Sequence, residues 1–378
     1  MKLNCIVISD VHFGAFKAPL LYSELEQVFF KEILKSESLD VVFIAGDLFD
    51  KKLSLNEEHA KYAIKFANNL TALASKMNFK IRMLRGTRNH DLHQLNNFQY
   101  LEGRKNTDFK IINTVTEEDM FGDEFKILYL PEEYMEDQEE YYKETLYNDE
   151  KHYDIIIGHG SIEFQSFESL NHLSERKIAN APTFKNKLLM EKSNLTVFGH
   201  IHNRCNYQEK LYYCGSFSRW IFGEEKPKGF IKFTYDTDDK TFDLKYVDNH
   251  LAREFKTIDI DEIMSDDTKG IDEKIKLIEK IKEDCQTDYV KFKYNVTDNI
   301  DDNQIVKNYF SENEEIVISA RKEKLRQDES EKELLKEYGF IFNKEYSLPE
   351  TISKFLEKKG QTLKAERIEE LLSDDGEN

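Results

Sequence analysis

Five apolar runs between Cys5 and Phe198 each lead into residues of the kinds that bind metal ions. The runs are Cys5–Ser9, Val41–Ala45, Ile81–Leu84, Ile155–Ile157 and Leu195–Phe198. Predominantly apolar sequence of this kind, here with Arg82 as its one charged residue, is typical of buried strands in a parallel sheet. The segments that follow are Asp10-Val11-His12, Gly46-Asp47-Leu48-Phe49-Asp50, Arg88-Asn89-His90-Asp91, Gly158-His159 and Gly199-His200-Ile201-His202. Ligands of open α/β sheets bind beyond the carboxyl ends of the strands, so these side chains are expected to converge on one site.

The residue types in these segments predict a hydrolytic site with two metal ions. Asp47 is expected to bridge the ions, because a carboxylate can give one oxygen to each. One ion would bind Asp10, His12 and either His200 or His202. The other ion would bind Asn89, His159 and the remaining one of these two histidines. Mixed oxygen and nitrogen ligands without thiolate suit Mn²⁺ or Fe and tolerate Zn²⁺.

His90 lies beside a predicted ligand and outside the ligand series. This position suits a group that protonates the leaving oxygen or stabilises the charged transition state. Asp91, the next residue, is expected to orient the His90 imidazole.

Strands and helices are expected to alternate over the first 200 or so residues, as in βαβ units. Ser23–Glu26 has the pattern of a capping box that opens a helix, and a longer helix is expected from about Asn56 to Met77. Three short strands are predicted in 211–247, and we expect them to form a second sheet packed on the first.

The rest of the chain is expected to form a smaller α/β module and a helical tail. The expected divisions are a catalytic domain at 1–250, an α/β capping domain at 251–320, a charged linker at 321–346, a helical segment at 347–372 and a disordered end at 373–378. Apolar residues of the helical segment recur on one face, and they are Ile352, Phe355, Leu356, Ile368 and Leu371. Helices this short are marginal alone, so they are expected to dock on another chain, with docking on the protein itself as the alternative.

The net charge of −19 argues at first against a nucleic-acid partner. However, residues 1–120 contain 16 Lys+Arg and 16 Asp+Glu, so the excess of acid lies downstream. Basic residues near the predicted ligands could meet a phosphate backbone or could be ordinary surface charges, and they include Lys51, Lys52, Arg85 and Arg88. The chain has neither a signal-peptide pattern nor an apolar run long enough to span a bilayer. We therefore expect a cytoplasmic protein without membrane contact, in a bacterial cell or a phage-infected host.

The ordered series D-x-H, G-D-x-x-D, N-H-D, G-H and G-H-x-H resembles that of the calcineurin-like metallophosphoesterases. Gly46–Asp50 is similar to the G-D-L-F-D form of SbcD-type DNA repair nucleases, and 213–229 is similar to the segment after their last metal motif. The order of parts is similar to that of the SbcD-type nucleases, and the length is similar to that of phage recombination endonuclease subunits. The motifs are specific over about the first 230 residues, and beyond them only the layout is similar.

The resemblance implies a four-layer α/β/β/α sandwich with two divalent ions, most simply Mn²⁺. It implies that His202 binds the first ion, that His200 binds the second, and that His90 is catalytic. Ser216 and Arg219 would join the basic residues in contacting DNA, and the capping domain at 251–320 would bind DNA as well. This chain departs from the family pattern at two positions. Arg88 stands where the family usually has Gly, and Asp50 stands where some members have His.

The function that the resemblance implies is a Mn²⁺-dependent DNA nuclease in double-strand break repair or recombination. It would act as an exonuclease on double-stranded ends and an endonuclease on single strands. It would work as a homodimer with an ABC-type ATPase bound by the C-terminal helices. The alternatives are a phosphatase or phosphodiesterase acting on a small molecule or phosphoprotein, and a catalytically inactive scaffold.

Overall fold

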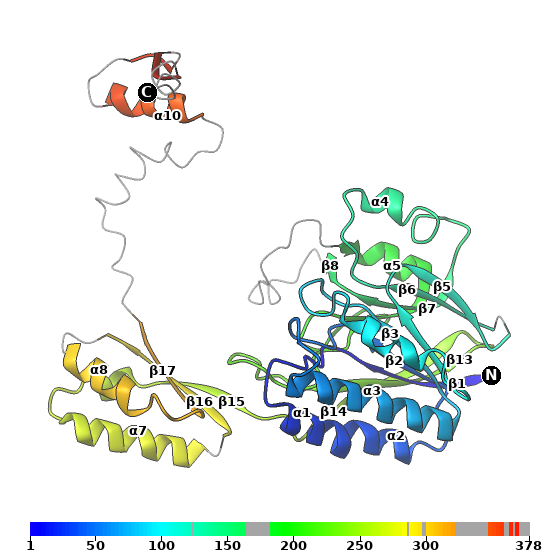
Figure 1. The fold of residues 1–378 in the computed structure, drawn as a ribbon, viewed down its shortest axis with the longest axis horizontal. Helices are drawn as coiled ribbons and strands as arrows, with labels where there is room; N and C mark the ends of the chain where they lie inside the picture. Colours follow the sequence, from blue (N-terminus) through cyan, green and yellow to red (C-terminus); the bar gives the residue numbers. More distant parts are fainter. Residues whose placement is uncertain are drawn as a thin grey trace.

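The computed structural model contains two facing β-sheets with helices on their outer sides (Figure 1). It describes residues 1–122, 124–163, 182–285, 287–296, 300–321, 347–358, 363–365 and 367–369. The expected linker after Arg321, the end at 373–378 and the predicted docking residue Leu371 lie outside the described residues.

The first sheet has the strand order β14-β13-β1-β2-β3-β4. In that order the strands span Thr241–Asp248, Gly229–Asp236, Lys2–Ile8, Val41–Ala45, Lys80–Leu84 and Asp108–Ile112. Strands β1 to β4 are parallel, whereas β13 is antiparallel to β1 and β14 is antiparallel to β13. The carboxyl ends of β1, β2 and β3 therefore share one edge of this sheet.

The second sheet has the order β11-β12-β10-β7-β6-β5. In that order the strands span Cys205–Tyr207, Leu211–Tyr213, Ser193–Gly199, Tyr153–His159, Phe125–Leu130 and Thr116–Met120. Strands β12, β10, β7 and β6 are parallel, and β11 and β5 pair antiparallel with β12 and β6. A short parallel pair, β8 and β9, lies beyond β7 at Ser161–Glu163 and Thr183–Lys185.

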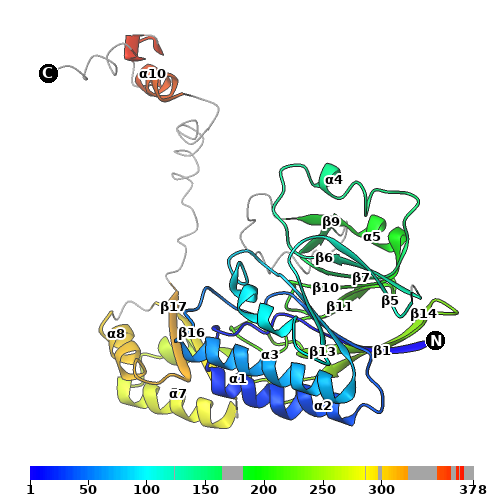
Figure 2. The ribbon, with the colours of Figure 1, turned by 45° about the vertical axis from the view of Figure 1, so that its right-hand side comes forward.

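Helices cover the outer face of each sheet (Figure 2). On the first sheet they are α1 (Ala18–Glu24), η1 (Leu25–Phe30), α2 (Lys31–Lys35), α3 (Glu58–Met77) and η2 (Gln94–Leu101). On the second they are α4 (Gln138–Tyr141) and α5 (Asn186–Lys192). Alternate residues of β1 face different cores: Ile6 and Ile8 pack on the helices, whereas Cys5 and Val7 pack against the second sheet. The predicted four-layer α/β/β/α class is confirmed.

The first helix begins earlier than the capping-box pattern predicts. It starts at Ala18 with Pro19 in its first turn, where the missing N–H of proline costs no helical hydrogen bond. Ser23 lies inside the continuous helical segment, and its Oγ accepts a hydrogen bond from Gln27 Nε2 at 2.8 Å. The prediction of a helix start at Ser23 was therefore wrong, because the pattern does not exclude a turn before it.

The sequence pattern suggested that the three strands in 211–247 form one sheet, but they belong to two different sheets. Only β12 joins the second sheet; β13 and β14 extend the first sheet beyond β1. Strand β13 places Ile231, Phe233 and Tyr235 between the sheets, in the same core as β7 and β10. Alternating apolar residues define the buried face of a strand but leave its neighbour unspecified, which explains the error.

A third, parallel sheet follows the sandwich, with the order β15-β16-β17. Its strands span Phe255–Asp259, Tyr289–Asn295 and Ile316–Arg321, and its helices are α6 (Asp261–Met264), α7 (Ile271–Cys285) and α8 (Ile300–Tyr309). The predicted strand-helix alternation is present in this module, which has its own apolar core. The last described helix is α10 (Leu348–Lys358).

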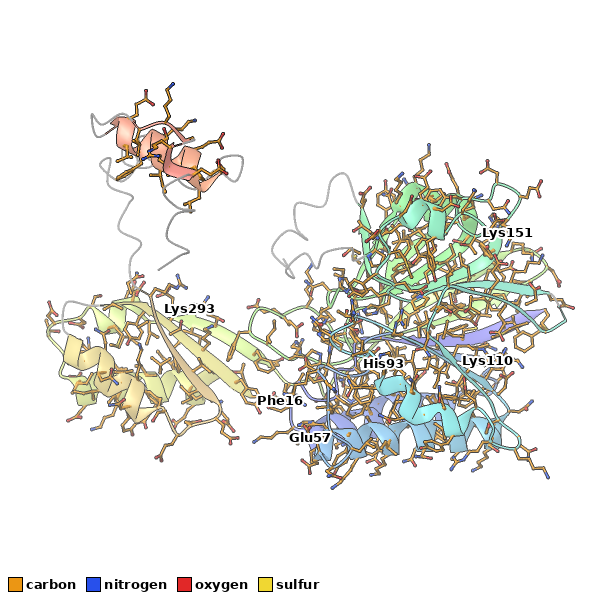
Figure 3. All side chains as sticks on the ribbon, turned by 45° about the horizontal axis from the view of Figure 1, so that its top comes forward. Phe16, Glu57, His93, Lys110, Lys151 and Lys293 are labelled. Carbon is orange, nitrogen blue, oxygen red and sulfur yellow. The ribbon has the colours of Figure 1, made fainter. Side chains whose placement is uncertain are left out.

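Aromatic and ionic contacts join this module to the sandwich. The rings of Phe16 and Tyr289 meet edge to face with centroids 5.2 Å apart, and Figure 3 labels Phe16 at this junction. Buried Arg253 donates to Glu24 Oε1 at 2.7 Å and lies over the Phe16 ring. The segment that leads into the module is thus fixed to α1 before β15 begins.

Candidate metal centre

The predicted ligands lie at the facing carboxyl ends of the two sheets. Asp10, His12, Asp47 and His200 all have positive φ angles, of 51°, 53°, 51° and 95°. Non-glycine residues rarely adopt this conformation, and they do so most often where a functional site imposes strain. Asp10 N and His12 N donate to the carbonyl groups of Gly46 and Asp47, each at 3.1 Å, so the loops after β1 and β2 hold one another in place.

Asp10, His12 and His202 form the first candidate ligand group. One ligand atom from each lies within 4.8 Å of those of the other two. His12 Nε2 is 3.0 Å from His202 Nε2, and Asp10 Oδ1 is 3.9 and 3.8 Å from these two nitrogens. Such spacings resemble those between neighbouring ligands of one ion, which are about 3 Å for bonds of about 2.1 Å at a right angle.

Asp47, His159 and His200 form the second candidate group. Asp47 Oδ1 is 3.3 Å from His159 Nε2. His159 Nδ1 lies 2.8 Å from the carbonyl oxygen of Ala45, the hydrogen bond that leaves Nε2 as the metal-binding nitrogen. His159 is fully buried at the end of β7, where Gly199 of β10 is its parallel partner.

His90 and Asp91 occupy different surroundings, although they are adjacent in the sequence. His90 Nδ1 is 2.8 Å from Asp47 Oδ2, and His90 forms a third group with His12 and Asp47. The buried Asp91 carboxylate accepts main-chain N–H groups of Asp47, Phe49 and Gly86 at 3.0, 3.1 and 2.8 Å. Asp91 therefore ties the loops after β2 and β3 together.

The pKa values of these groups are shifted by burial and by the pairing of carboxylates with imidazoles. Burial lowers the pKa of His12 well below its ordinary value, which leaves a neutral imidazole. Burial alone would raise the pKa of Asp47, but His159 and His90 outweigh it and hold that pKa well below the usual range. Burial raises the pKa of Asp10 to about 6. For His90, burial is opposed by the hydrogen bond and charge of Asp47, which raise its pKa to about 9.

The two carboxylates of the cluster have no lysine or arginine partner among the described residues. Among the described residues, the ion pairs of Asp10 and Asp47 are with histidines alone, and none involves Lys or Arg. Buried carboxylates are costly unless a cation compensates them. One or more divalent ions would supply that charge, and neutral imidazoles would then complete the coordination.

The motifs alone did not identify three residues at this site as contributors. Glu224 accepts a hydrogen bond from His202 Nδ1 at 2.6 Å and from Trp220 N at 2.8 Å, so it orients the imidazole. Glu132 and Thr87 are buried beside His159 and His200. A signal for Glu132 was available, because it follows the apolar run of β6 as the expected ligands follow theirs.

Asn89 lies at the surface, unlike the other predicted ligands. Its side chain is exposed, whereas Thr87, two residues earlier, is 2% exposed. A turn explains the difference: His90 N and Asp91 N both donate to the carbonyl group of Thr87, at 2.9 and 3.0 Å. Arg88 and Asn89 form the outer part of this turn.

The residues expected to contact DNA differ in their exposure and in their hydrogen-bond partners. Lys51, Lys52 and Arg88 are exposed beside the cluster. Ser216 is fully buried, with its Oγ donating to Ser218 O and accepting from Lys228 Nζ at 2.8 and 2.9 Å. The hydroxyl of Ser216 therefore lies inside the protein, away from any surface that a duplex could reach.

The two remaining arginines of that set bind main-chain carbonyl groups. Arg219 donates to Glu224 O and Ala252 O, each at 2.9 Å, and so links the loop before β13 to the segment before β15. Arg85 Nη2 donates to Glu132 O at 3.3 Å, and its side chain remains 26% exposed. Of the two, Arg85 keeps more freedom to meet an anion.

The predicted docking residues of the tail are partly covered. Phe355 is 38% exposed on α10, Ile352 and Leu356 are half-buried, and Ile368 is buried. Ser353 Oγ donates to Leu363 O at 2.6 Å, which joins α10 to the segment that contains Ile368.

A two-sheet sandwich with Asp and His side chains gathered at its facing strand ends is the arrangement of a metal-dependent hydrolase. Residues 3–204 match the calcineurin-like phosphoesterase family. The chain therefore belongs to that family, whose members are metal-dependent phosphoester hydrolases. No curated protein matches this sequence significantly. Within the described residues, no helix is long and apolar enough to cross a membrane.

Proposed function

We propose that this protein is a Mn²⁺-dependent DNA nuclease with two ions at the candidate metal centre. The observation that carries the proposal is the position of Asp47 between the ligand groups. Its Oδ2 is 4.0 Å from His12 Nε2, and its Oδ1 is 3.3 Å from His159 Nε2. One carboxylate thus faces both groups, as a bridging ligand must.

The side chains around Asp47 have separate tasks in phosphodiester hydrolysis. When bound, the two cations supply Lewis-acid polarisation of the phosphoryl oxygens and lower the pKa of a water nucleophile. His90 Nδ1 lies 2.8 Å from Asp47 Oδ2 and its ring is partly exposed, so it is placed to donate a proton toward the leaving oxygen. Glu224 and the Ala45 carbonyl group fix the imidazoles of His202 and His159, which limits reorganisation during the reaction.

The charge around the site supports a polyanionic substrate. Exposed Lys51, Lys52 and Arg88 lie next to the ligand loops in a chain that is otherwise strongly acidic. Cations at such positions bind backbone phosphates and align the scissile bond. A small monoester would need fewer cations outside the metal centre.

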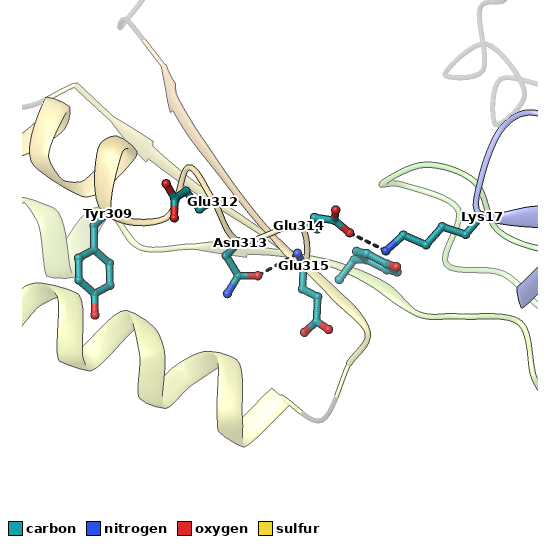
Figure 4. A pocket seen from close by; sticks show the side chains of 7 residues that line it. Lys17, Tyr309, Glu312, Asn313, Glu314 and Glu315 are labelled. Atoms are coloured by element: carbon teal, nitrogen blue, oxygen red, sulfur yellow. Dashed lines mark hydrogen bonds and ion pairs between the residues drawn. The ribbon is translucent and has the colours of Figure 1, made fainter.

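An acidic hollow lies beside the third sheet, and DNA is not expected to bind there. A hollow of about 560 Å³ between Lys17 and the third sheet is lined by Glu312, Glu314 and Glu315 (Figure 4). Its one lysine is already paired with Glu314 at 2.5 Å. Like charges would repel a phosphate backbone there, so the proposed DNA path follows the ligand loops instead.

The proposed assembly is a homodimer that binds an ABC-type ATPase through α10 and the residues after it. Exposed Phe355 on a short amphipathic helix supports docking in a groove of another chain. Replacing Phe355 and Leu356 together with glutamate should abolish co-purification with the ATPase subunit and leave nuclease activity unchanged. Loss of thermal stability in that variant would instead show that the helix packs on its own chain.

The substrate and metal proposal is tested with Asp47→Ala. Linear duplex DNA, circular single-stranded DNA and a generic phosphodiester dye are incubated with Mn²⁺ and each protein. We expect wild-type activity on both DNAs, none in Asp47→Ala, and wild-type activity in the control Asp119→Ala, whose carboxylate is exposed on β5. Cleavage of the dye without either DNA would favour a small-substrate phosphodiesterase and contradict the nuclease proposal.

The role of His90 needs a separate test, because it lies close enough to Asp47 to be a ligand. His90→Gln should keep its metal content and lose at least about a hundredfold in rate, the usual contribution of a proton donor. The matched control is His93→Gln, an exposed neighbour whose loss should change neither. Loss of an ion from His90→Gln would make His90 a ligand.

A further inference from the structure

The loop between β3 and η2 brings a hydroxyl group, rather than the expected amide, to the second ligand group. Thr87 N donates to Asp47 Oδ1 at 2.6 Å, which fixes Thr87 beside the proposed bridging carboxylate. The turn that starts at Thr87 then carries Arg88 and Asn89 outward and returns the chain at His90. Thr87 directly follows Gly86, so this side chain takes the first position after the glycine.

The Thr87 hydroxyl lies close to every member of the second group. Its Oγ1 is 3.1 Å from Asp47 Oδ2, 3.4 Å from His159 Nε2 and 3.5 Å from His200 Nδ1. Two ligands at right angles on an ion, each about 2.1 Å from it, are separated by about 3 Å. The Thr87 oxygen therefore has the spacing of a neighbouring ligand relative to both histidines, and it also lies beside the Asp47 oxygen that faces His12.

Glu132 occupies a further position in the same group. Its Oε2 is 3.2 Å from Thr87 Oγ1, 3.8 Å from His159 Nε2 and 3.5 Å from His200 Nδ1. Its carboxylate is 1% exposed, and Oε1 accepts the hydroxyl proton of Tyr134. Among the residues that the structure describes, no Lys or Arg side chain forms an ion pair with the Glu132 carboxylate, whose ion-pair partners are His159 and His200.

We propose that Thr87 and Glu132 are ligands of the second ion and that Asn89 is not. This inference rests on the proposed two-metal centre and assigns the residues that complete it. The full set for that ion is Asp47, Thr87, Glu132, His159 and His200. Compared with an amide ligand, the pair adds one negative charge and makes oxygens the majority, which suits a hard ion such as Mn²⁺ over Zn²⁺.

The geometry also gives Tyr134 a supporting task. Its hydroxyl group binds the Glu132 oxygen that faces away from the histidines, which fixes the orientation of the carboxylate. The Tyr134 hydroxyl further accepts Arg88 N at 3.2 Å, so the same side chain holds the outer part of the turn. Tyr134 therefore couples the turn to the ligand carboxylate without contacting the ion itself.

The test measures metal binding in the full-length protein. Manganese content and Mn²⁺ titration calorimetry are compared for wild type, Asn89→Ala, Thr87→Val and Glu132→Gln, with exposed Glu136→Gln as the control. We expect two ions in wild type, Asn89→Ala and the control. Thr87→Val and Glu132→Gln should weaken the second ion at least about tenfold and remove the spin-coupled Mn²⁺ signal in electron paramagnetic resonance.

Four outcomes separate the possible failures. Loss of the second ion in Asn89→Ala overturns the assignment, as does retention of both ions in Glu132→Gln. If Glu132→Gln or Thr87→Val unfolds, Glu132→Asp and Thr87→Ser give the answer, since each keeps the ligand type and should restore binding. Fewer than two ions in the wild-type protein would contradict the two-metal proposal itself.

Discussion

Gly199 at the end of β10 offers a sharp test of how the two sheets meet at the metal centre. A methyl group added at this position would collide with Ser9 Oγ and with the carbonyl oxygen of Ala45, and would lie 2.8 Å from His159 Nδ1. The last two atoms are themselves joined by the hydrogen bond that orients His159. Gly199→Ala must therefore push β10 away from β1 and β2 or break that bond.

The cost of Gly199→Ala follows from the rigidity of these neighbours. Overpacking a core costs about 1–3 kcal/mol, and a buried main-chain oxygen on a central strand places this site near 3 kcal/mol. For a unit the size of the sandwich, this corresponds to a fall in melting temperature of about 6–12 °C. Displacing the group that orients His159 should also weaken metal binding about 10–100-fold.

The assay is thermal unfolding by circular dichroism with and without Mn²⁺, together with Mn²⁺ titration calorimetry. The control is Gly103→Ala, because an added methyl group there meets no atom within 4 Å. We expect the control to match wild type in both measurements. A Gly199→Ala protein that also matched wild type would refute the close contact between β10 and β2.

Further predictions concern the first sheet and the C-terminal region. Arg82 is 1% exposed and binds both oxygens of Glu118 at 2.7 and 2.8 Å, so Arg82→Met should lower the free energy of unfolding by about 3 kcal/mol in urea titrations. Burial would raise the pKa values of Glu118 and Asp108, but Arg82 outweighs burial and lowers both. The stabilisation that these carboxylates gain from Arg82 is therefore complete above their unfolded-state pKa values of about 4. It is lost as the pH falls through their lower folded-state pKa values. The cost of Arg82→Met should accordingly shrink below about pH 4, and a pH-independent cost would contradict this. Truncation after Arg321 should leave Mn²⁺-dependent nuclease activity intact and abolish ATPase binding, whereas a large fall in melting temperature would mean that the tail packs on the protein body.

The strands and the residues at their carboxyl ends could be predicted because the local sequence pattern marks where each buried strand ends. The runs that became β1, β2, β3, β7 and β10 are predominantly apolar, with Arg82 as their one charged residue, and parallel strands bring their carboxyl ends to one edge. Asp10, His12, Asp47, His159, His200 and His202 follow directly from that rule, and the structure brings them together.

The surroundings of the second group could not be predicted in the same way. The path of the turn from Thr87 to Asp91 depends on hydrogen bonds to Asp47, which is 40 residues away from Thr87 in the sequence. The motif pattern therefore favoured Asn89, whose chemistry is right and whose position is exposed. Glu132 follows the apolar run of β6, but its place beside His159 depends on β6 lying next to β7, which the local sequence does not specify.

The membership of β13 and β14 in the first sheet depends on long-range pairing as well. Antiparallel pairing of Lys2 with Asp236 joins residues from nearly opposite ends of the sandwich sequence. The alternation of apolar residues in β13 is equally compatible with either sheet, since both bury one face in the same core.

The most direct test of the two-metal centre is anomalous X-ray diffraction from crystals of the full-length protein grown with Mn²⁺. The account predicts two manganese peaks about 3.5–4 Å apart, with Asp47 contacting both. One peak should lie beside Asp10, His12 and His202, and the other beside His159 and His200. A single peak, or a pair that Asp47 does not bridge, would contradict the central claim.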